Sequence, residues 1–223
     1  MIWTKKNLYP PKKREEWYST WNRCEKKLIL LDLDGTILDT AGDLGGAANA
    51  LRKKRGMSAI DIAEYRGFIS KGAKGMIQVA QDLESDHPKF DELREEFLEE
   101  YSKNLLNKTE FLPNMDVFLK KLDEMNIKWG IVTNKHTNYA LPIINGIPLL
   151  NEGCSILVCG DTTNYPKPHP DPILFALKEL NFTGEQTIYV GDDPRDIQSG
   201  YSAGCWTHAL KFFENKASTG MKS

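Results

Sequence analysis

Short, continuous apolar runs occur once near the start of the chain and repeatedly in its second half. Strands that are buried on both faces of a parallel sheet have this uninterrupted hydrophobicity. The predicted strands are Leu28–Leu33, Ile127–Thr133, Ser155–Cys159, Thr187–Val190 and Trp206–Leu210. Helical spacing of apolar residues follows most of them, and this alternation predicts an α/β fold with a parallel sheet.

The helical pattern divides the chain into parts. In the second half, helices are predicted at Asn114–Met125, Thr137–Ile144, Asp171–Leu180 and Ile197–Ala203. Between the first two strands the predicted helices are Ala41–Gly56, Ser58–Glu64, Ala73–Asp82 and Phe90–Leu106, with no strand pattern among them. We therefore expect a core of residues 28–43 and 109–213, with an inserted helical cap at 44–108.

The two ends of the chain stand apart from this pattern. Residues 1–27 are polar, basic and rich in aromatic side chains, with a short helix expected at Glu15–Cys24. These aromatic residues could stack on nucleic-acid bases, but packing on the core or on a partner chain is the favoured interpretation. No function is assigned to this extension, and residues 214–223 are expected to form a polar tail.

Composition narrows the possible partners and the compartment. The chain has 223 residues and a formal net charge of −2, which gives no reason to expect nucleic acid or an anionic membrane as a partner. No apolar run approaches the roughly 18–20 residues of a membrane helix, and the N-terminus lacks the apolar core of a secretory signal. We expect a cytoplasmic monomer or homodimer. The four cysteines form no C-x-x-C pair, so free thiols are expected and a zinc site is not.

Two carboxylates end the first predicted strand. Residues i and i+2 of a strand share a face, so Asp32 and Asp34 are expected to point the same way. Gly35 lets the backbone turn and Thr36 offers a hydroxyl. Two adjacent like charges are costly unless a cation lies between them, and Mg²⁺ prefers such oxygen ligands.

Other strand ends carry polar residues too. Thr133 and Asn134 end the second predicted strand, and Asp192 and Asp193 end the fourth. The carboxyl ends of parallel strands meet in one crevice, so these residues should converge. Lys167 lies among three prolines, which restrict its loop, and it supplies a positive side chain.

This set of residues suits phosphoryl transfer. Asp32 would attack phosphorus to form an aspartyl phosphate, and Asp34 would protonate the leaving alkoxide and then activate water. Lys167 and the metal would neutralise the phosphoryl oxygens. The expected metal ligands are the Asp32 carboxylate, the Asp34 backbone carbonyl and an Asp192 carboxylate.

Four segments in this order resemble the motifs of the haloacid dehalogenase superfamily of phosphatases. They are Asp32–Thr36, Ile131–Asn134, Lys167-Pro168 and Gly191–Asp196, and the similarity to phosphoglycolate phosphatases and their near relatives extends over about Leu28 to Leu210. The resemblance implies a Rossmann-like core, a helical cap inserted after the first motif, Mg²⁺ dependence and a small phosphorylated metabolite as substrate.

The resemblance also implies roles for individual residues. Phosphate contacts are expected from Gly35, Thr36, Thr133, Asn134 and Lys167. Asp196 would hold Lys167 or a metal-bound water, although Asp193 matches an acidic position in some relatives and remains an alternative. Specificity is expected to come from the cap, where Arg66 and Lys71, together with Ser70 and Lys74, would meet a substrate carboxylate. A solvated basic helix start is the competing interpretation for each lysine.

The expected activity is hydrolysis of 2-phosphoglycolate. A sugar phosphate such as N-acetylmuramate 6-phosphate and a phosphomutase reaction are alternatives within the same chemistry. A signalling module that accepts phosphate on Asp32 is disfavoured, because it has no use for the insert or for Asp34. Dehalogenation is disfavoured because relatives with that activity lack the second acid.

Overall fold

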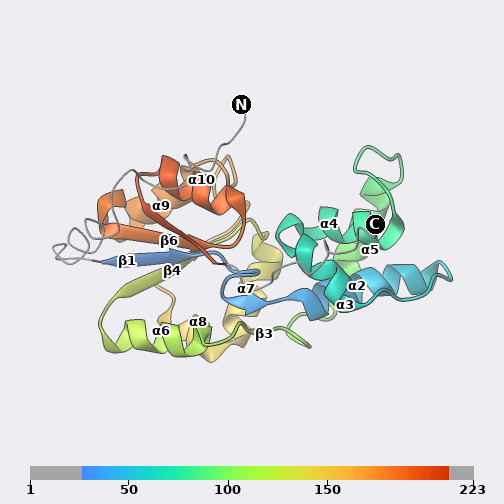
Figure 1. Ribbon diagram of the computed structural model, residues 1–223, viewed down its shortest axis with the longest axis horizontal. Helices are drawn as coiled ribbons and strands as arrows, with labels where there is room; N and C mark the ends of the chain where they lie inside the picture. The colour runs from blue at the N-terminus through green and yellow to red at the C-terminus, as the bar shows by residue number, and fades with distance from the viewer. Residues whose placement is uncertain (1–26, 211–223) are drawn as a thin grey trace, which may run out of the picture. The chain divides into compact units, whose positions relative to one another are not determined.

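The computed structural model describes residues 27–210, which form two compact units. The core unit contains residues 27–37 and 113–210, and the insert unit is Leu38–Leu112 (Figure 1). The insert unit thus begins earlier and ends later in the sequence than the cap expected at 44–108. The helix expected at Glu15–Cys24 and the tail at 214–223 lie outside the described residues.

A five-stranded parallel sheet forms the centre of the core unit. Its strands are β1 (Leu28–Leu31), β4 (Lys128–Val132), β5 (Leu157–Val158), β6 (Thr187–Gly191) and β7 (Trp206–Ala209), in the order β5-β4-β1-β6-β7. The central strand β1 pairs in register with β4 and β6, and all four of its residues are buried. The predicted α/β fold with a parallel sheet is therefore confirmed.

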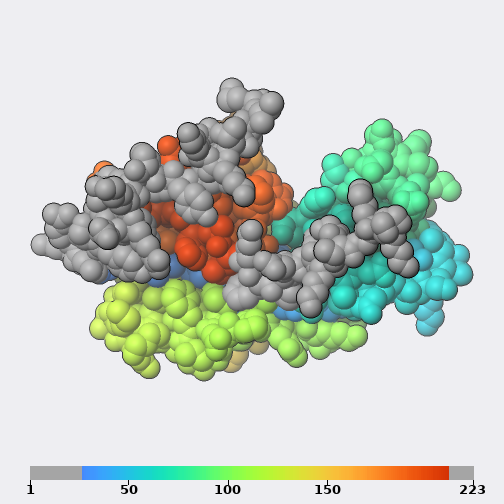
Figure 2. Space-filling view, viewed as in Figure 1, coloured from blue at the N-terminus to red at the C-terminus, as the bar shows by residue number. Residues whose placement is uncertain are grey.

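Helices cover both faces of this sheet. They are α6 (Met115–Glu124), α7 (Thr137–Gly146), α8 (Pro148–Gly153), α9 (Asp171–Leu180) and α10 (Pro194–Ser202), with a 3₁₀ turn at Gly184–Gln186. The helices α9 and α10 lie on one face, and α6 and α8 on the other (Figure 1). In the space-filling view α6, coloured yellow-green, forms part of the outer surface (Figure 2). Val117 within this helix and Met125 directly after it are exposed.

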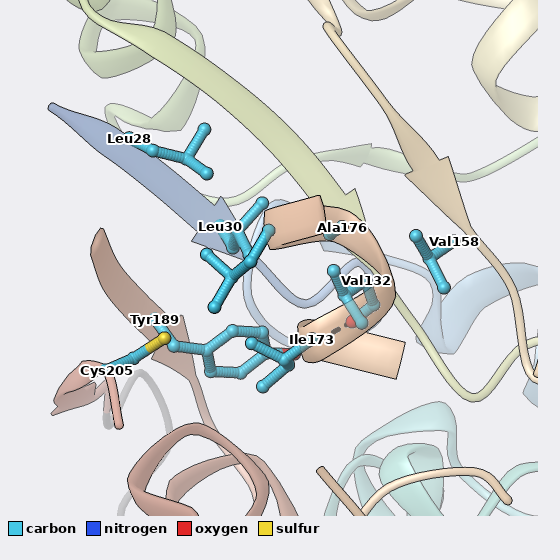
Figure 3. Packing of buried hydrophobic residues seen from close by; sticks show 9 residues of the cluster. Leu28, Leu30, Val132, Val158, Ile173, Ala176, Tyr189 and Cys205 are labelled. Atoms are coloured by element: carbon cyan, nitrogen blue, oxygen red, sulfur yellow. Dashed lines mark hydrogen bonds between the residues drawn. The ribbon is translucent and has the colours of Figure 1, made fainter. Parts of the chain in front are cut away.

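A hydrophobic cluster joins the sheet to α9. Leu28 and Leu30 of β1 pack with Val132 of β4 and Ile173 of α9, and each of these four residues is fully buried (Figure 3). Burying one such side chain contributes roughly 1.5–3 kcal/mol. The ring of Tyr189 lies in the same cluster with its hydroxyl directed at the backbone of Val132 (Figure 3). This packing fixes the strand ends that carry the polar residues.

The insert unit is helical except for one short ribbon. It contains α2 (Ala41–Lys54), α3 (Ile62–Tyr65), a 3₁₀ helix (Arg66–Lys71), α4 (Gly72–Gln81) and α5 (Phe90–Ser102). Antiparallel pairing of β2 (Leu38–Asp39) with β3 (Glu110–Phe111), which the sequence pattern did not predict, joins the two ends of the unit. The buried Asp43 carboxylate strengthens this junction by accepting bonds from the Lys108 backbone N–H (2.8 Å) and the Thr109 hydroxyl (2.7 Å).

Cys154, Cys159 and Cys205 are free thiols, as expected, and the last two are buried. Among residues 27–210, no helix is long and apolar enough to cross a membrane.

Candidate active site

Three aspartates meet at the carboxyl ends of the central strands. Asp32 directly follows β1, Asp192 directly follows β6, and Asp196 lies in the first turn of α10. One carboxylate oxygen from each lies within 4.8 Å of the others. Asp32 is only 7% exposed, and its backbone N–H donates to Val190 of β6 at 2.9 Å. The predicted convergence of Asp32 and Asp192 is thus present in the structure.

Lys167 lies against two of these carboxylates. Its Nζ is 2.9 Å from Oδ1 of Asp32 and 2.6 Å from Oδ1 of Asp196. The Lys167 ammonium donates its hydrogen bonds to Asp196, the Val132 carbonyl and the Tyr189 hydroxyl. Its contact with Asp32 is therefore an ion pair. Burial of this side chain acts to lower its pKa, but the two carboxylates outweigh burial and the pKa is raised. Lys167 is therefore a fixed positive charge beside Asp32.

The environment of Asp32 works against its ionisation. Burial, together with the neighbouring Asp196 and Asp192, raises its pKa to about 7, and Lys167 only partly offsets this. A carboxyl group attacks phosphorus only as the carboxylate. A further cation at this position would favour the ionised form.

The residues around the aspartates fit such a cation. Gly35 has φ of +81°, and a Cβ there would lie 2.5 Å from Oδ2 of Asp192. Glycine thus provides the backbone turn and leaves room for the Asp192 carboxylate. Carboxylate oxygens suit Mg²⁺. Both carboxylate oxygens of Asp196 accept hydrogen bonds, Oδ1 from Lys167 and Oδ2 from the Asp193 N–H at 3.0 Å, so Asp32 and Asp192 are the side chains that could hold the ion.

Two expected phosphate-binding side chains have other partners. Thr36 is fully buried and its hydroxyl donates to Oδ1 of Asp192 at 2.9 Å, so it orients that carboxylate. The Asn134 amide accepts from the Lys167 backbone N–H at 2.9 Å and donates to the Lys167 carbonyl at 2.8 Å. Both side chains therefore hold other site residues in place, which differs from the phosphate contacts expected of them. Thr133 directly follows β4, and its hydroxyl oxygen accepts a hydrogen bond from the Lys135 N–H at 3.2 Å.

Asp193 and Asp196 occupy different positions. The Asp193 carboxylate caps α10 by accepting from the Arg195 backbone N–H at 2.8 Å, and it also pairs with the Arg195 guanidinium. These bonds, led by the guanidinium contact, outweigh burial and lower the pKa of Asp193. Asp196 is the acid that contacts Lys167. The geometry thus favours Asp196 over Asp193 as the partner of the lysine.

Lys135 and Tyr189 belong to the site but were missed by the sequence analysis. Lys135 Nζ contacts both carboxylate oxygens of Asp34, at 3.0 and 2.9 Å. The Tyr189 hydroxyl accepts from Lys167 and donates to the Val132 carbonyl, both at 2.8 Å. The available signals were a lysine directly after the polar end of the second strand and a tyrosine among the aliphatic residues of a buried strand.

The residues expected to meet substrate in the insert have local partners. Arg66 pairs with Asp39. Lys71 is exposed, with its Nζ 4.9 Å from the centre of the Phe68 ring. Their roles toward substrate stay predictions.

An aspartate-rich site at the carboxyl ends of a parallel sheet, with a helical insert after the first strand, defines a class of hydrolases. The chain belongs to the haloacid dehalogenase-like hydrolases, because the model of that family matches residues 29–210. The resemblance found in the sequence motifs is thereby confirmed.

Two relatives that match most of the chain are named as phosphatases. An N-acetylmuramic acid 6-phosphate phosphatase from Pseudomonas putida is 37% identical over 186 residues, covering 83% of each chain. A phosphoglycolate phosphatase from Xanthomonas campestris pv. campestris is 37% identical over 180 residues, covering 80% of each chain.

Solved structures show the same fold. A predicted phosphoglycolate phosphatase from Haemophilus somnus has a TM-score of 0.74 at 27% identity, covering 85% of this chain and 87% of that one. CbbY from Rhodobacter sphaeroides has a TM-score of 0.63 at 20% identity, covering 82% of this chain and 84% of that one, and supports the fold alone.

Proposed function

We propose that this protein is a Mg²⁺-dependent phosphatase that cleaves small phosphomonoesters through an aspartyl-phosphate intermediate on Asp32. The observation that carries the proposal is the contact between Asp32 and Lys167 beside Asp192. It combines a carboxylate nucleophile, a fixed cation for the phosphoryl oxygens and a second carboxylate that suits a metal. Binding modules and structural proteins have no need of this buried and costly arrangement of charges.

The first half-reaction forms the intermediate. An oxygen of the Asp32 carboxylate attacks phosphorus, and the bond from phosphorus to the leaving oxygen breaks. Asp34 gives a proton to that oxygen, which leaves as an alcohol. Lys167 stabilises the charge on the phosphoryl oxygens, and the Thr133 hydroxyl would donate a hydrogen bond to them. Held by Asp32 and Asp192, Mg²⁺ would supply Lewis-acid charge neutralisation.

The second half-reaction restores the enzyme. Asp34, now a carboxylate, takes a proton from water as the water oxygen attacks phosphorus of the aspartyl phosphate. The acyl–phosphate linkage breaks at its phosphorus–oxygen bond, which releases inorganic phosphate and the Asp32 carboxylate. Asp196, Tyr189 and Asn134 hold Lys167 in position during both steps.

Two substrates are favoured by the names of the similar proteins and by the motifs. We propose 2-phosphoglycolate first and N-acetylmuramic acid 6-phosphate second, because relatives of each kind are 37% identical to this chain. Both compounds carry a carboxylate as well as the phosphate. Arg66 and Lys71 are the residues we propose for recognition of that second anionic group.

A substrate screen tests the proposal. Purified protein is assayed for phosphate release from 2-phosphoglycolate, N-acetylmuramate 6-phosphate and other small phosphomonoesters, with Mg²⁺ and with EDTA. We expect Mg²⁺-dependent release from at least one of them, and at least a 10³-fold loss in Asp32→Asn because the nucleophile is removed. Absence of hydrolysis across the panel by folded protein overturns the proposal. Phosphate appearing on an organic product rather than as inorganic phosphate indicates a phosphomutase.

A further inference from the structure

Asp34 is held by a lysine of its own. Lys135 Nζ lies 3.0 Å from Oδ1 and 2.9 Å from Oδ2 of Asp34, so one ammonium contacts both oxygens. The Lys135 side chain is only 7% exposed and the Asp34 side chain 13%. The two residues are far apart in sequence and come together because β1 and β4 are neighbouring parallel strands.

The backbone that carries Lys135 is fixed on both sides. Its N–H donates to the Thr133 hydroxyl at 3.2 Å, and its carbonyl accepts from the Gly160 N–H at 2.9 Å. A Cβ at Gly160 would lie 2.3 Å from the Asn134 carbonyl, so the two segments pass in close contact. A flexible side chain that starts from a rigid backbone and ends on a nearly buried carboxylate has a defined position.

This pair differs from an ordinary surface ion pair. Exposed lysine–carboxylate pairs usually contribute little to stability and hold neither partner firmly. Desolvating two charges is costly, so a nearly buried pair is weak evidence for stability. The desolvation cost of the Lys135–Asp34 pair is better explained by the function of Asp34. The two aspartates of the first motif thus have different cationic partners. Lys167 pairs with Asp32, and Lys135 pairs with Asp34.

We infer that Lys135 is a positioning residue for the acid–base step, an inference that rests on the proposed phosphatase function. Its ammonium holds the Asp34 carboxyl group where that group can exchange a proton with the leaving oxygen. The proton passes between Asp34 and the substrate oxygen, and Lys135 neither gains nor loses a covalent bond. The role is confined to Asp34, so in the first half-reaction it should be visible only where proton transfer to the leaving group limits the rate.

The experiment compares leaving groups. Phenyl phosphate needs protonation of its leaving oxygen much more than 4-nitrophenyl phosphate does, and kcat/KM reports only the steps through formation of the aspartyl phosphate. General acid catalysis is worth about 10²–10⁴-fold in total. We expect Lys135→Met to lower kcat/KM about tenfold or more for phenyl phosphate and less than about threefold for 4-nitrophenyl phosphate. Lys135→Arg, which keeps the cation, should recover part of the loss.

Two controls separate positioning from a structural role. Lys128→Met changes an exposed lysine at the start of β4, the strand that precedes Lys135, and should leave both rates unaltered. In an Asp34→Asn background, Lys135→Met should cause little further loss for phenyl phosphate, because residues that act through one another are not additive. Thermal unfolding of each variant confirms that the assays use folded protein.

The outcomes distinguish this inference from the proposed function. Equal losses on both substrates, no loss, or full additivity with Asp34→Asn overturn the role of Lys135 and leave the phosphatase proposal intact. Absence of wild-type hydrolysis on both substrates overturns the proposed function and, with it, this inference.

Discussion

At the scale of single residues, the site is built from charges that would be unstable alone. Asp32 is buried beside Asp192 and Asp196, and the opposing charge of Lys167 does not cancel the rise in its pKa. Such an arrangement is tolerated at a functional site because the charges are needed there. The cost of the charge should therefore be measurable as a pH-dependent loss of stability.

Asp32→Asn should stabilise the metal-free protein more at high pH than at low pH. The pKa of Asp32 is raised from 3.8 to about 7 on folding. Between these values the unfolded chain has released the proton while the folded protein still holds it, so wild-type stability falls as pH rises through this window. The full effect is up to about 4 kcal/mol, since one pKa unit corresponds to about 1.4 kcal/mol.

The measurement is urea unfolding of both proteins in EDTA at about pH 4 and about pH 8. Comparing the two proteins at each pH cancels contributions from other groups to a first approximation. The stability of Asp32→Asn relative to wild type should increase between the two pH values. The same relative stability at both would contradict the burial of an ionisable Asp32.

Tyr189→Phe should destabilise the protein by about 1–3 kcal/mol, the usual cost of leaving buried polar groups unsatisfied. The hydroxyl is fully buried and serves both Lys167 and the Val132 carbonyl. Tyr201→Phe in α10 is the matched control, because that tyrosine is 57% exposed and should change stability little. Equal unfolding free energies for the two variants would show that the Tyr189 hydroxyl makes no net contribution.

At the scale of elements, the turns after the strands determine which atoms meet. The turn after β1 brings Gly35 against Asp192. The turn after β4 brings Asn134 to the Lys167 backbone, which sets where the lysine side chain begins. A substitution in a turn should therefore affect the site more than the fold.

Gly35→Ala should weaken activation by Mg²⁺. Its φ of +81° is unfavourable for alanine, and the new Cβ would displace the Asp192 carboxylate. Changes next to metal ligands typically cost about 10–100-fold in metal affinity, and we expect the Mg²⁺ concentration for half-maximal activity to rise by that factor. Gly46→Ala in α2 is the control, since nothing lies within 4 Å of its Cβ position. It should leave Mg²⁺ activation unaltered, and a similar shift in both variants would refute the explanation.

The elements that could be predicted from sequence are those with a clear period. The helix α9 spans Asp171–Leu180 as expected, and each predicted strand of the parallel sheet is present. The β2–β3 ribbon was missed because two-residue strands have no measurable alternation, and α8 because six residues are too few to show helical spacing. The helix α10 begins at Pro194, three residues before its predicted start at Ile197, since the Asp193 cap signal was overlooked.

At the scale of the whole molecule, the order of strands explains how distant segments form one site. β1 is central, so the residues after it meet those after β4 on one side and after β6 on the other. The sequence motifs predicted the convergence of Asp32 and Asp192 for this reason. They could not predict that Lys135 contacts Asp34 or that Asn134 holds the Lys167 backbone, because side-chain pairing depends on the geometry of turns rather than on residue type.

The central claim is that Asp32 becomes covalently phosphorylated during turnover. Asp34→Asn removes the base that activates water, so it should allow the aspartyl phosphate to accumulate from 4-nitrophenyl phosphate, whose leaving group needs little protonation. Rapid quenching followed by borohydride reduction converts an aspartyl phosphate to homoserine, which peptide mass spectrometry locates. We predict substrate-dependent homoserine at position 32. Hydrolysis that proceeds without homoserine at position 32, or with homoserine at another aspartate, would contradict the account.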